Sequence, residues 1–181
     1  MAIRFFVVTF VIVLSVGVGQ YLKKKNMDYF STGFSSAILK KVPDVKLENV
    51  YTGELVSFKD LKRRKNIFVH FWATWCGPCE VEFPGLMQLT KTAQVSSQNL
   101  FVFVAVNDDK KKVKKFLDRF KAKGNPDIYL LIDNEGLTEE KFGVFKLPET
   151  FVFNSLTGDV KHKFTGPQEW TSNHFTRTLS R

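Results

Sequence analysis

Short apolar runs separated by polar turns recur along the chain after residue 42, and they alternate with segments whose apolar residues have helical spacing. The runs that are rich in β-branched and aromatic residues predict strands at residues 67–72, 100–106, 128–132, 150–153 and 160–164. The segments with helical spacing predict helices at residues 76–96, 108–123, 139–145 and 170–179. In the first of these helices, the apolar positions include Val81, Leu86 and Leu89.

Residues 45–50 and 55–58 are expected to form a β-hairpin with its turn at Gly53, because apolar residues flank a polar segment that contains a glycine. A short helical turn is expected at residues 59–61. Strands that alternate with helices, and that end in a second hairpin, predict an α/β fold. We expect a mixed central sheet with helices on both faces and the first hairpin as an N-terminal extension.

An apolar run of 18 residues, Phe5–Leu22, precedes this pattern. At about 1.5 Å per residue a helix of this length spans roughly 27 Å, which is enough for the hydrocarbon core of a bilayer. The run therefore predicts a transmembrane helix, acting as a signal anchor, within residues 1–22. A cleaved signal peptide is the alternative, because Gly17-Val18-Gly19 offers a weak cleavage site. A buried core helix is the third possibility.

Residues 23–41 have no clear period and are interpreted as a juxtamembrane linker, which leaves residues 42–181 as one domain of ordinary size. The formal net charge is +9, and it is unevenly spread. Six of the 27 basic residues but only one of the 18 acidic residues lie in the first 41 positions. The excess charge thus lies beside the apolar run, which favours contact with anionic lipid headgroups over nucleic acid.

The chain has two cysteines, in the run Trp75-Cys76-Gly77-Pro78-Cys79 at the start of a predicted helix. Unpaired backbone N–H groups and the helix dipole stabilise a thiolate at that position, so Cys76 is predicted to be the nucleophile. Cys79 is predicted to be the resolving thiol, which attacks the Cys76 sulfur of a mixed disulfide and releases the substrate.

A structural zinc site contains the same Cys-x-x-Cys spacing and is the alternative interpretation. Such a site normally needs four ligands, and the chain has no second cysteine pair. Its histidines also lack the close spacing of zinc ligands: His70, His162 and His174. A strand before the cysteines and a helix after them favour a redox pair that works without a bound cofactor or metal.

The run from Phe71 to Cys79, followed by Glu82-Phe83-Pro84, resembles the thioredoxin superfamily, and within it the membrane-anchored TlpA, ResA and CcmG branch. Further matches follow in family order across about residues 42–166: Pro43-Asp44, Tyr51-Thr52-Gly53, Leu131-Ile132-Asp133 with Gly136, Phe142-Gly143-Val144 and Leu147-Pro148-Glu149-Thr150-Phe151. Pro84 resembles the proline that kinks the family's helix. The resemblance implies a thioredoxin-like fold and thiol-disulfide oxidoreductase activity.

The resemblance also implies that Pro148 is a cis-proline in a loop that lies against the cysteines, which the chemistry of X-Pro bonds allows. Leu147 would then pair with an extended substrate segment, and Trp75, Gly77 and Pro78 would contact the substrate. A trans proline that merely starts a strand is the alternative.

Two residues are candidates for proton handling. Glu82 occupies the place where ResA-like proteins carry a glutamate, and if buried it would have a raised pKa suited to accepting the Cys79 proton. The alternative is an acid that simply favours the first turns of a helix. His70 departs from the family, which has an aspartate or asparagine there. It is either a buried histidine with a hydrogen-bond partner or a second member of the proton pathway.

The expected function is the reduction of protein disulfides outside the cytoplasm, for example those of apocytochrome c, with electrons from a membrane thiol conduit of the DsbD or CcdA type. The alternatives are an oxidant, a general disulfide exchanger and a non-catalytic binding module. The orientation stays open, because Lys23, Lys24 and Lys25 outweigh Arg4 and by the positive-inside rule favour a cytoplasmic domain. The lysines between residues 110 and 115 are interpreted as a solvated helix face, with partner docking as the alternative.

Overall fold

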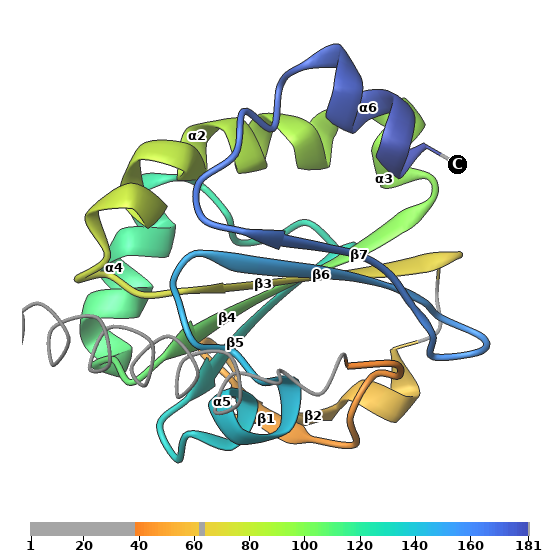
Figure 1. Ribbon diagram of the computed structural model, residues 1–181. Coiled ribbons are helices and arrows are strands. Elements are labelled where there is room, and N and C mark those ends of the chain that lie inside the picture. Colours follow the sequence, from red (N-terminus) through yellow and green to blue (C-terminus); the bar gives the residue numbers. More distant parts are fainter. Residues whose placement is uncertain (1–38, 62–63, 181) are drawn as a thin grey trace, which may run out of the picture. The chain divides into compact units, whose positions relative to one another are not determined.

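The predicted strands lie side by side in one seven-stranded mixed sheet (Figure 1). The computed structural model describes residues 39–61 and 64–180. The strands are β1 (Lys46–Asn49), β2 (Leu55–Ser57), β3 (Asn66–Trp72), β4 (Asn99–Val106), β5 (Ile128–Asp133), β6 (Glu149–Asn154) and β7 (Val160–Thr165). Their order across the sheet is β2-β1-β5-β4-β3-β6-β7.

The centre of the sheet is parallel and its flanks are antiparallel. β3 pairs with β4, and β4 with β5, in parallel. Every residue of β3 and β4 is buried, as expected for strands covered on both faces. β6 runs antiparallel to β3, in a register that places Thr150 opposite His70. This register brings two polar side chains together in the middle of an apolar sheet.

Helices cover both faces of the sheet, as predicted. They are η1 (Phe58–Asp60), α2 (Gly77–Lys91), α3 (Ala93–Ser96), α4 (Lys110–Arg119), α5 (Leu137–Phe142) and α6 (Asn173–Leu179). One core contains the apolar residues of α2, α3, α4 and α6, and the other contains those of η1 and α5. Figure 1 shows α2 and α6 above the sheet and α5 below it. The α/β fold and the N-terminal hairpin are thus confirmed, the latter with Gly53 at a φ of 75° in its turn.

All four predicted helices have different bounds in the structure, and two of the differences have a clear cause in the backbone. The helix expected to run to Ser96 ends at Lys91, because Thr92 adopts an extended backbone (φ −73°, ψ 111°), and α3 follows as a separate turn. The helix expected at 139–145 begins earlier, at Leu137, and is ended by Gly143, whose φ of 65° is left-handed. Val81 was wrongly placed on the apolar face of α2, since its side chain is 81% exposed.

The buried carboxylate of Asp133 fixes the start of α5. It accepts hydrogen bonds from the backbone N–H of Thr138 (2.7 Å), from the Thr138 hydroxyl (2.6 Å) and from the N–H groups of Glu135 and Leu137 (3.2 Å each). These bonds satisfy N–H groups that the first turn of a helix leaves free. They anchor α5 to the end of β5, and α5 in turn leads into the loop that forms one wall of the site described below.

The predicted membrane span at residues 1–22 and most of the predicted linker lie outside the described residues. None of the helices within residues 39–61 and 64–180 has the length and apolar character needed to cross a membrane. The residues from Leu39 onward form one compact unit. The domain boundary at residue 42 stays a prediction.

Candidate active site

Cys76 lies where the buried strand β3 passes into helix α2. It is the N-cap residue of α2, with extended backbone angles, and its sulfur accepts a hydrogen bond from the backbone N–H of Cys79 at 3.3 Å. Gly77 and Pro78 form the first turn, where the missing N–H of proline costs nothing. An N–H group and the positive end of a fifteen-residue helix therefore point at this sulfur, and both stabilise a thiolate.

The two cysteines are joined in a disulfide, and they differ in exposure. Cys76 keeps 6% of its surface exposed, whereas Cys79 is completely buried. Only Cys76 can thus be reached from solvent. The geometry agrees with the predicted division into an attacking and a resolving thiol, which remains a proposal about their roles.

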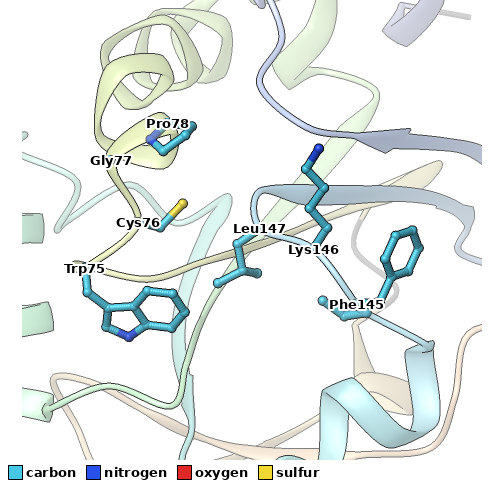
Figure 2. Close-up of a pocket in the computed structure, with 8 residues that line it drawn as sticks. Trp75, Cys76, Gly77, Pro78, Phe145, Lys146 and Leu147 are labelled. Atoms are coloured by element: carbon cyan, nitrogen blue, oxygen red, sulfur yellow. The ribbon is translucent and has the colours of Figure 1, made fainter.

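A groove of about 510 Å³ opens beside Cys76 (Figure 2). It is lined by residues from the start of α2 and from the loop after α5: Trp75, Cys76, Gly77, Pro78, Val144, Phe145, Lys146 and Leu147. The Trp75 side chain is 64% exposed, and its indole N–H donates to the carbonyl of Asn107 at 3.1 Å. In Figure 2 the Leu147 side chain lies between Trp75 and Lys146. The four residues predicted to contact substrate, Trp75, Gly77, Pro78 and Leu147, all line this groove.

The peptide bond between Leu147 and Pro148 is cis, as the resemblance implies. The Pro148 carbonyl accepts a hydrogen bond from the N–H of Gly166 at 2.8 Å. Within the described residues, the backbone N–H and C=O of Leu147 make no hydrogen bond, although Leu147 lines the groove. A backbone edge that has no partner within the fold and lines a groove next to Cys76 can pair with an extended segment of another chain.

Glu82 lies one helical turn after Cys79, on the same side of α2, and is buried. Burial raises the pKa of its carboxyl from 4.5 to about 7, because the charged form loses its hydration. Two donors act in the opposite direction and stabilise the carboxylate. They are the backbone N–H of Gln168 and the indole N–H of Trp170, at 2.8 and 2.9 Å from Oε2. Glu82 thus has the burial that the proton-handling hypothesis requires, and its role stays a prediction.

His70 lies at the centre of β3 and is fully buried. Its Nδ1 is 2.8 Å from the Thr150 hydroxyl, and its Nε2 is 3.5 Å from Oε1 of Glu82. Burial lowers the pKa of the imidazole to about 3, so the ring is neutral at ordinary pH. Both readings of this residue are thus compatible with the structure: it has a hydrogen-bond partner, and it faces the candidate proton acceptor.

The comparison with protein families gives a match to Redoxin over residues 39–179. The chain belongs to the Redoxin family. Within the family it is similar to the thiol-disulfide oxidoreductase ResA of Geobacillus thermodenitrificans, at 31% identity over 139 residues, which cover 77% of this chain and 75% of that protein. It is also similar to the thiol:disulfide interchange protein DsbE of Escherichia coli K12, at 32% identity over 146 residues, which cover 77% of this chain and 73% of that protein.

Among solved structures, this Redoxin protein is similar to a thiol:disulfide interchange protein of the thioredoxin family from Chlorobium tepidum. That match has 27% sequence identity and a TM-score of 0.61, and it covers 77% of this chain and 93% of the other. The protein is therefore a thiol-disulfide oxidoreductase of the ResA and DsbE type, with Cys76 and Cys79 as its cysteine pair. The alternative of a non-catalytic binding module is not supported.

Several residues of this Redoxin site were not predicted from the sequence. Thr150, Gln168 and Trp170 contact the two buried titratable groups, yet they lie between 80 and 88 positions away along the chain. Phe145 and Lys146 of the groove precede the recognised Leu147-Pro148 motif. Their nearness to that motif is the one signal that points to them.

Proposed function

We propose that this oxidoreductase reduces disulfides of protein substrates outside the cytoplasm while held at a membrane by residues 1–22. The apolar run Phe5–Leu22 supports the anchor. The resemblance to the TlpA, ResA and CcmG branch supports the extracytoplasmic side, against the charge bias of Lys23–Lys25. The same resemblance supports apocytochrome c as a substrate and a membrane thiol conduit of the DsbD or CcdA type as the electron donor.

The reaction begins with the reduced protein. The Cys76 thiolate attacks one sulfur of the substrate disulfide, forms a mixed disulfide and expels the other substrate sulfur, which takes up a proton. Glu82 then accepts the proton of Cys79. The Cys79 thiolate attacks Cys76, closes the disulfide seen in the structure and releases the second substrate sulfur. The second substrate sulfur takes the proton held by Glu82, and solvent supplies the proton for the first. Two electrons and the Cys79 proton thus pass from the protein to the substrate, and the electron donor restores the dithiol.

The observation that carries the reductive direction is the charge of the groups beneath the cysteines. A strong oxidant stabilises its reduced form, and a positive charge near the thiolate is one way to do so. Here His70 is held neutral by burial, which lowers its pKa to about 3, and Glu82 is neutral or negative. Neither group stabilises a thiolate by charge. Because neither group adds to the stabilisation that the helix N-terminus gives the thiolate, their charge supports the reductive direction.

Substrate binding is assigned to the groove beside Cys76. The unpaired backbone of Leu147 would form main-chain hydrogen bonds to an extended cysteine-containing segment, and Pro148 would hold that backbone in place. Trp75, Gly77 and Pro78 would line the opposite wall. The apolar faces of Trp75 and Leu147 would accept apolar side chains that flank the substrate cysteine.

The reduction potential of the Cys76–Cys79 pair tests the direction of electron flow. Equilibration of the purified protein with dithiothreitol redox buffers, followed by alkylation and mass spectrometry, gives the dithiol fraction at each potential. We expect a value near or below that of thioredoxin, about −270 mV. A value near about −120 mV, which is typical of the oxidant DsbA, would instead support the alternative that the protein introduces disulfides.

A further inference from the structure

The two carboxyl oxygens of Glu82 have different surroundings. Oε2 accepts two hydrogen bonds, from the N–H of Gln168 and the indole N–H of Trp170. Because both partners are donors that cannot accept a hydrogen bond, a proton on Oε2 would face two other hydrogens. When Glu82 is protonated, its proton therefore belongs on Oε1.

Oε1 of Glu82 faces His70. It lies 3.5 Å from Nε2 of the imidazole, and within the described residues neither atom has a hydrogen-bond partner. The side chains are 2% and 0% exposed, so an unmatched pair of polar atoms here would be costly. On its other side, Nδ1 of His70 contacts the Thr150 hydroxyl at 2.8 Å, and a hydroxyl can either donate or accept.

We propose that Glu82 and His70 form one unit in which ionisation of Glu82 reverses the tautomer of a neutral His70. In the protonated state, Oε1–H donates to Nε2, and Nδ1–H donates to the Thr150 oxygen. In the ionised state, Nε2–H donates to the carboxylate, and Nδ1 accepts from the Thr150 hydroxyl. The states differ by one proton, and the ring proton changes nitrogen by exchange with solvent.

This inference rests on the proposed role of Glu82 as acceptor of the Cys79 proton and adds a positioning role for His70. A neutral imidazole that can switch tautomers offers a donor to the carboxylate and an acceptor to the acid. Both the protonated and the ionised form of Glu82 thereby have a hydrogen-bond partner in a buried site. Glu82 can then gain or lose its proton without leaving a buried polar atom unpaired.

The groups that surround the unit do not offer a competing charge. The rings next to His70 are those of Phe103 on β4 and Trp170, whose centroids lie 5.8 and 6.4 Å from the centroid of the imidazole. Cys79 of α2 lies one turn away from Glu82, and in the oxidised protein its sulfur is held in the disulfide with Cys76. No charge on another described residue contributes to the pKa shift of either His70 or Glu82. The titration of the unit is thus expected to follow Glu82 itself.

Nitrogen-15 NMR of the imidazole side chains tests the proposal directly. Oxidised protein labelled at histidine would be titrated from pH 5 to pH 9, with His162 and His174 as internal references. We expect His70 to stay neutral throughout and to change from the Nδ1–H to the Nε2–H tautomer, with a midpoint near pH 7. A single tautomer at both ends, or an imidazolium signal from His70 within this range, would overturn the proposal.

Two substitutions add a functional readout. His70→Phe keeps an aromatic ring beside Phe103 and removes both the donor to the carboxylate and the acceptor of the protonated acid. Because the lost hydrogen bond to the charged form is the stronger of the two, the pH midpoint of disulfide exchange is expected to rise by about one unit. The matched control is His162→Phe on β7, a half-buried histidine that stacks on Phe164 and is expected to leave the midpoint unchanged. Equal midpoints in His70→Phe and the wild type would contradict the positioning role.

The NMR experiment uses isolated oxidised protein, so its result does not depend on the direction of electron flow. A tautomer change together with a reduction potential near that of DsbA would retain the unit and reject the reductive function. A fixed tautomer together with a potential near that of thioredoxin would do the reverse. The two proposals can therefore fail separately.

Discussion

The Cys79→Ser variant is expected to lose all catalytic turnover and to accumulate as a covalent adduct with its substrates. Cys76 keeps its position at the N-terminus of α2, so it still attacks a substrate disulfide. A serine at position 79 cannot expel the bound substrate, so the mixed disulfide persists. Non-reducing electrophoresis and mass spectrometry of the purified variant, incubated with a peptide disulfide, measure the adduct.

The matching controls are the Cys76→Ser variant and the double variant. Both lack the accessible sulfur and are expected to form no adduct, because Cys79 is completely buried. If Cys76→Ser captured the peptide as efficiently as Cys79→Ser, the two roles would have to be exchanged. If neither variant captured it, the groove would not be the place where substrates react.

The Glu82→Gln variant is expected to release substrate from the mixed disulfide about 100-fold more slowly at pH 7, which is at the low end for general acid–base catalysis. An amide keeps the size and the polar contacts of the side chain, but it cannot take the Cys79 proton. Rapid-quench measurement of product release as a function of pH reports the loss. The wild-type rate is expected to rise through about pH 7, where burial places the pKa of Glu82, whereas the variant has no such step.

Glu80→Gln is the matched control for this substitution. Glu80 is an exposed residue of the same helix, where it forms an ion pair with Arg119 at 2.6 Å. Its replacement is expected to leave both the rate and the pH profile unchanged. The same release rate and pH step in Glu82→Gln as in the wild type would remove Glu82 from the proton pathway.

The stability of the Glu82→Gln variant gives a second readout. The folded state keeps the Glu82 proton up to about pH 7, whereas the unfolded chain loses it above 4.5, so this group lowers the free energy of unfolding as pH rises through that range. The neutral His70, with a pKa of about 3 against 6.5, raises that free energy as pH rises from about 3 to 6.5. Between pH 4.5 and 6.5 the two effects on the free energy of unfolding oppose each other in the wild type. A variant that lacks the Glu82 carboxyl can therefore be distinguished from the wild type by its pH dependence.

Removal of the carboxyl leaves the His70 effect alone. Urea denaturation at pH 4.5 and pH 6.5 is therefore expected to give a larger increase in stability with pH for Glu82→Gln than for the wild type. The slopes of the free energy of unfolding against pH then differ between the two proteins by up to about 1.4 kcal/mol per pH unit. That limit applies where the folded state holds one more proton on Glu82 than the unfolded state. An identical pH dependence for the two proteins would mean that Glu82 has the same pKa in the folded and the unfolded state, which would contradict the effect of burial.

The strands could be located from the sequence because the central ones are covered on both faces. β3 and β4 are buried at every position, and such strands give continuous apolar runs with sharp ends. The break between α2 and α3 could not be located in this way. It depends on the backbone angles of Thr92, a residue that does not by itself end a helix.

Some residues of the site could likewise be predicted from the sequence, and others could not. Cys76, Cys79 and Glu82 are close in sequence, so helix geometry alone brings them to one end and one side of α2. The partners of Glu82 and His70 come from elsewhere in the fold. Thr150 reaches His70 through the β3–β6 register, and Trp170 reaches Glu82 from the segment that follows β7. The β3–β6 register and the path of the chain after β7 are set by packing between distant segments. No local pattern in this sequence predicts them.

The assignment of Cys76 as the attacking thiol and Cys79 as the resolving thiol is tested most directly by alkylation of the reduced wild-type protein. A substoichiometric amount of iodoacetamide at pH 7, followed by peptide mapping, shows which sulfur reacts first. The exposed position of Cys76 at the helix N-terminus predicts that the label is found on Cys76, with Cys79 protected. Equal labelling of both residues, or faster labelling of Cys79, would contradict this account.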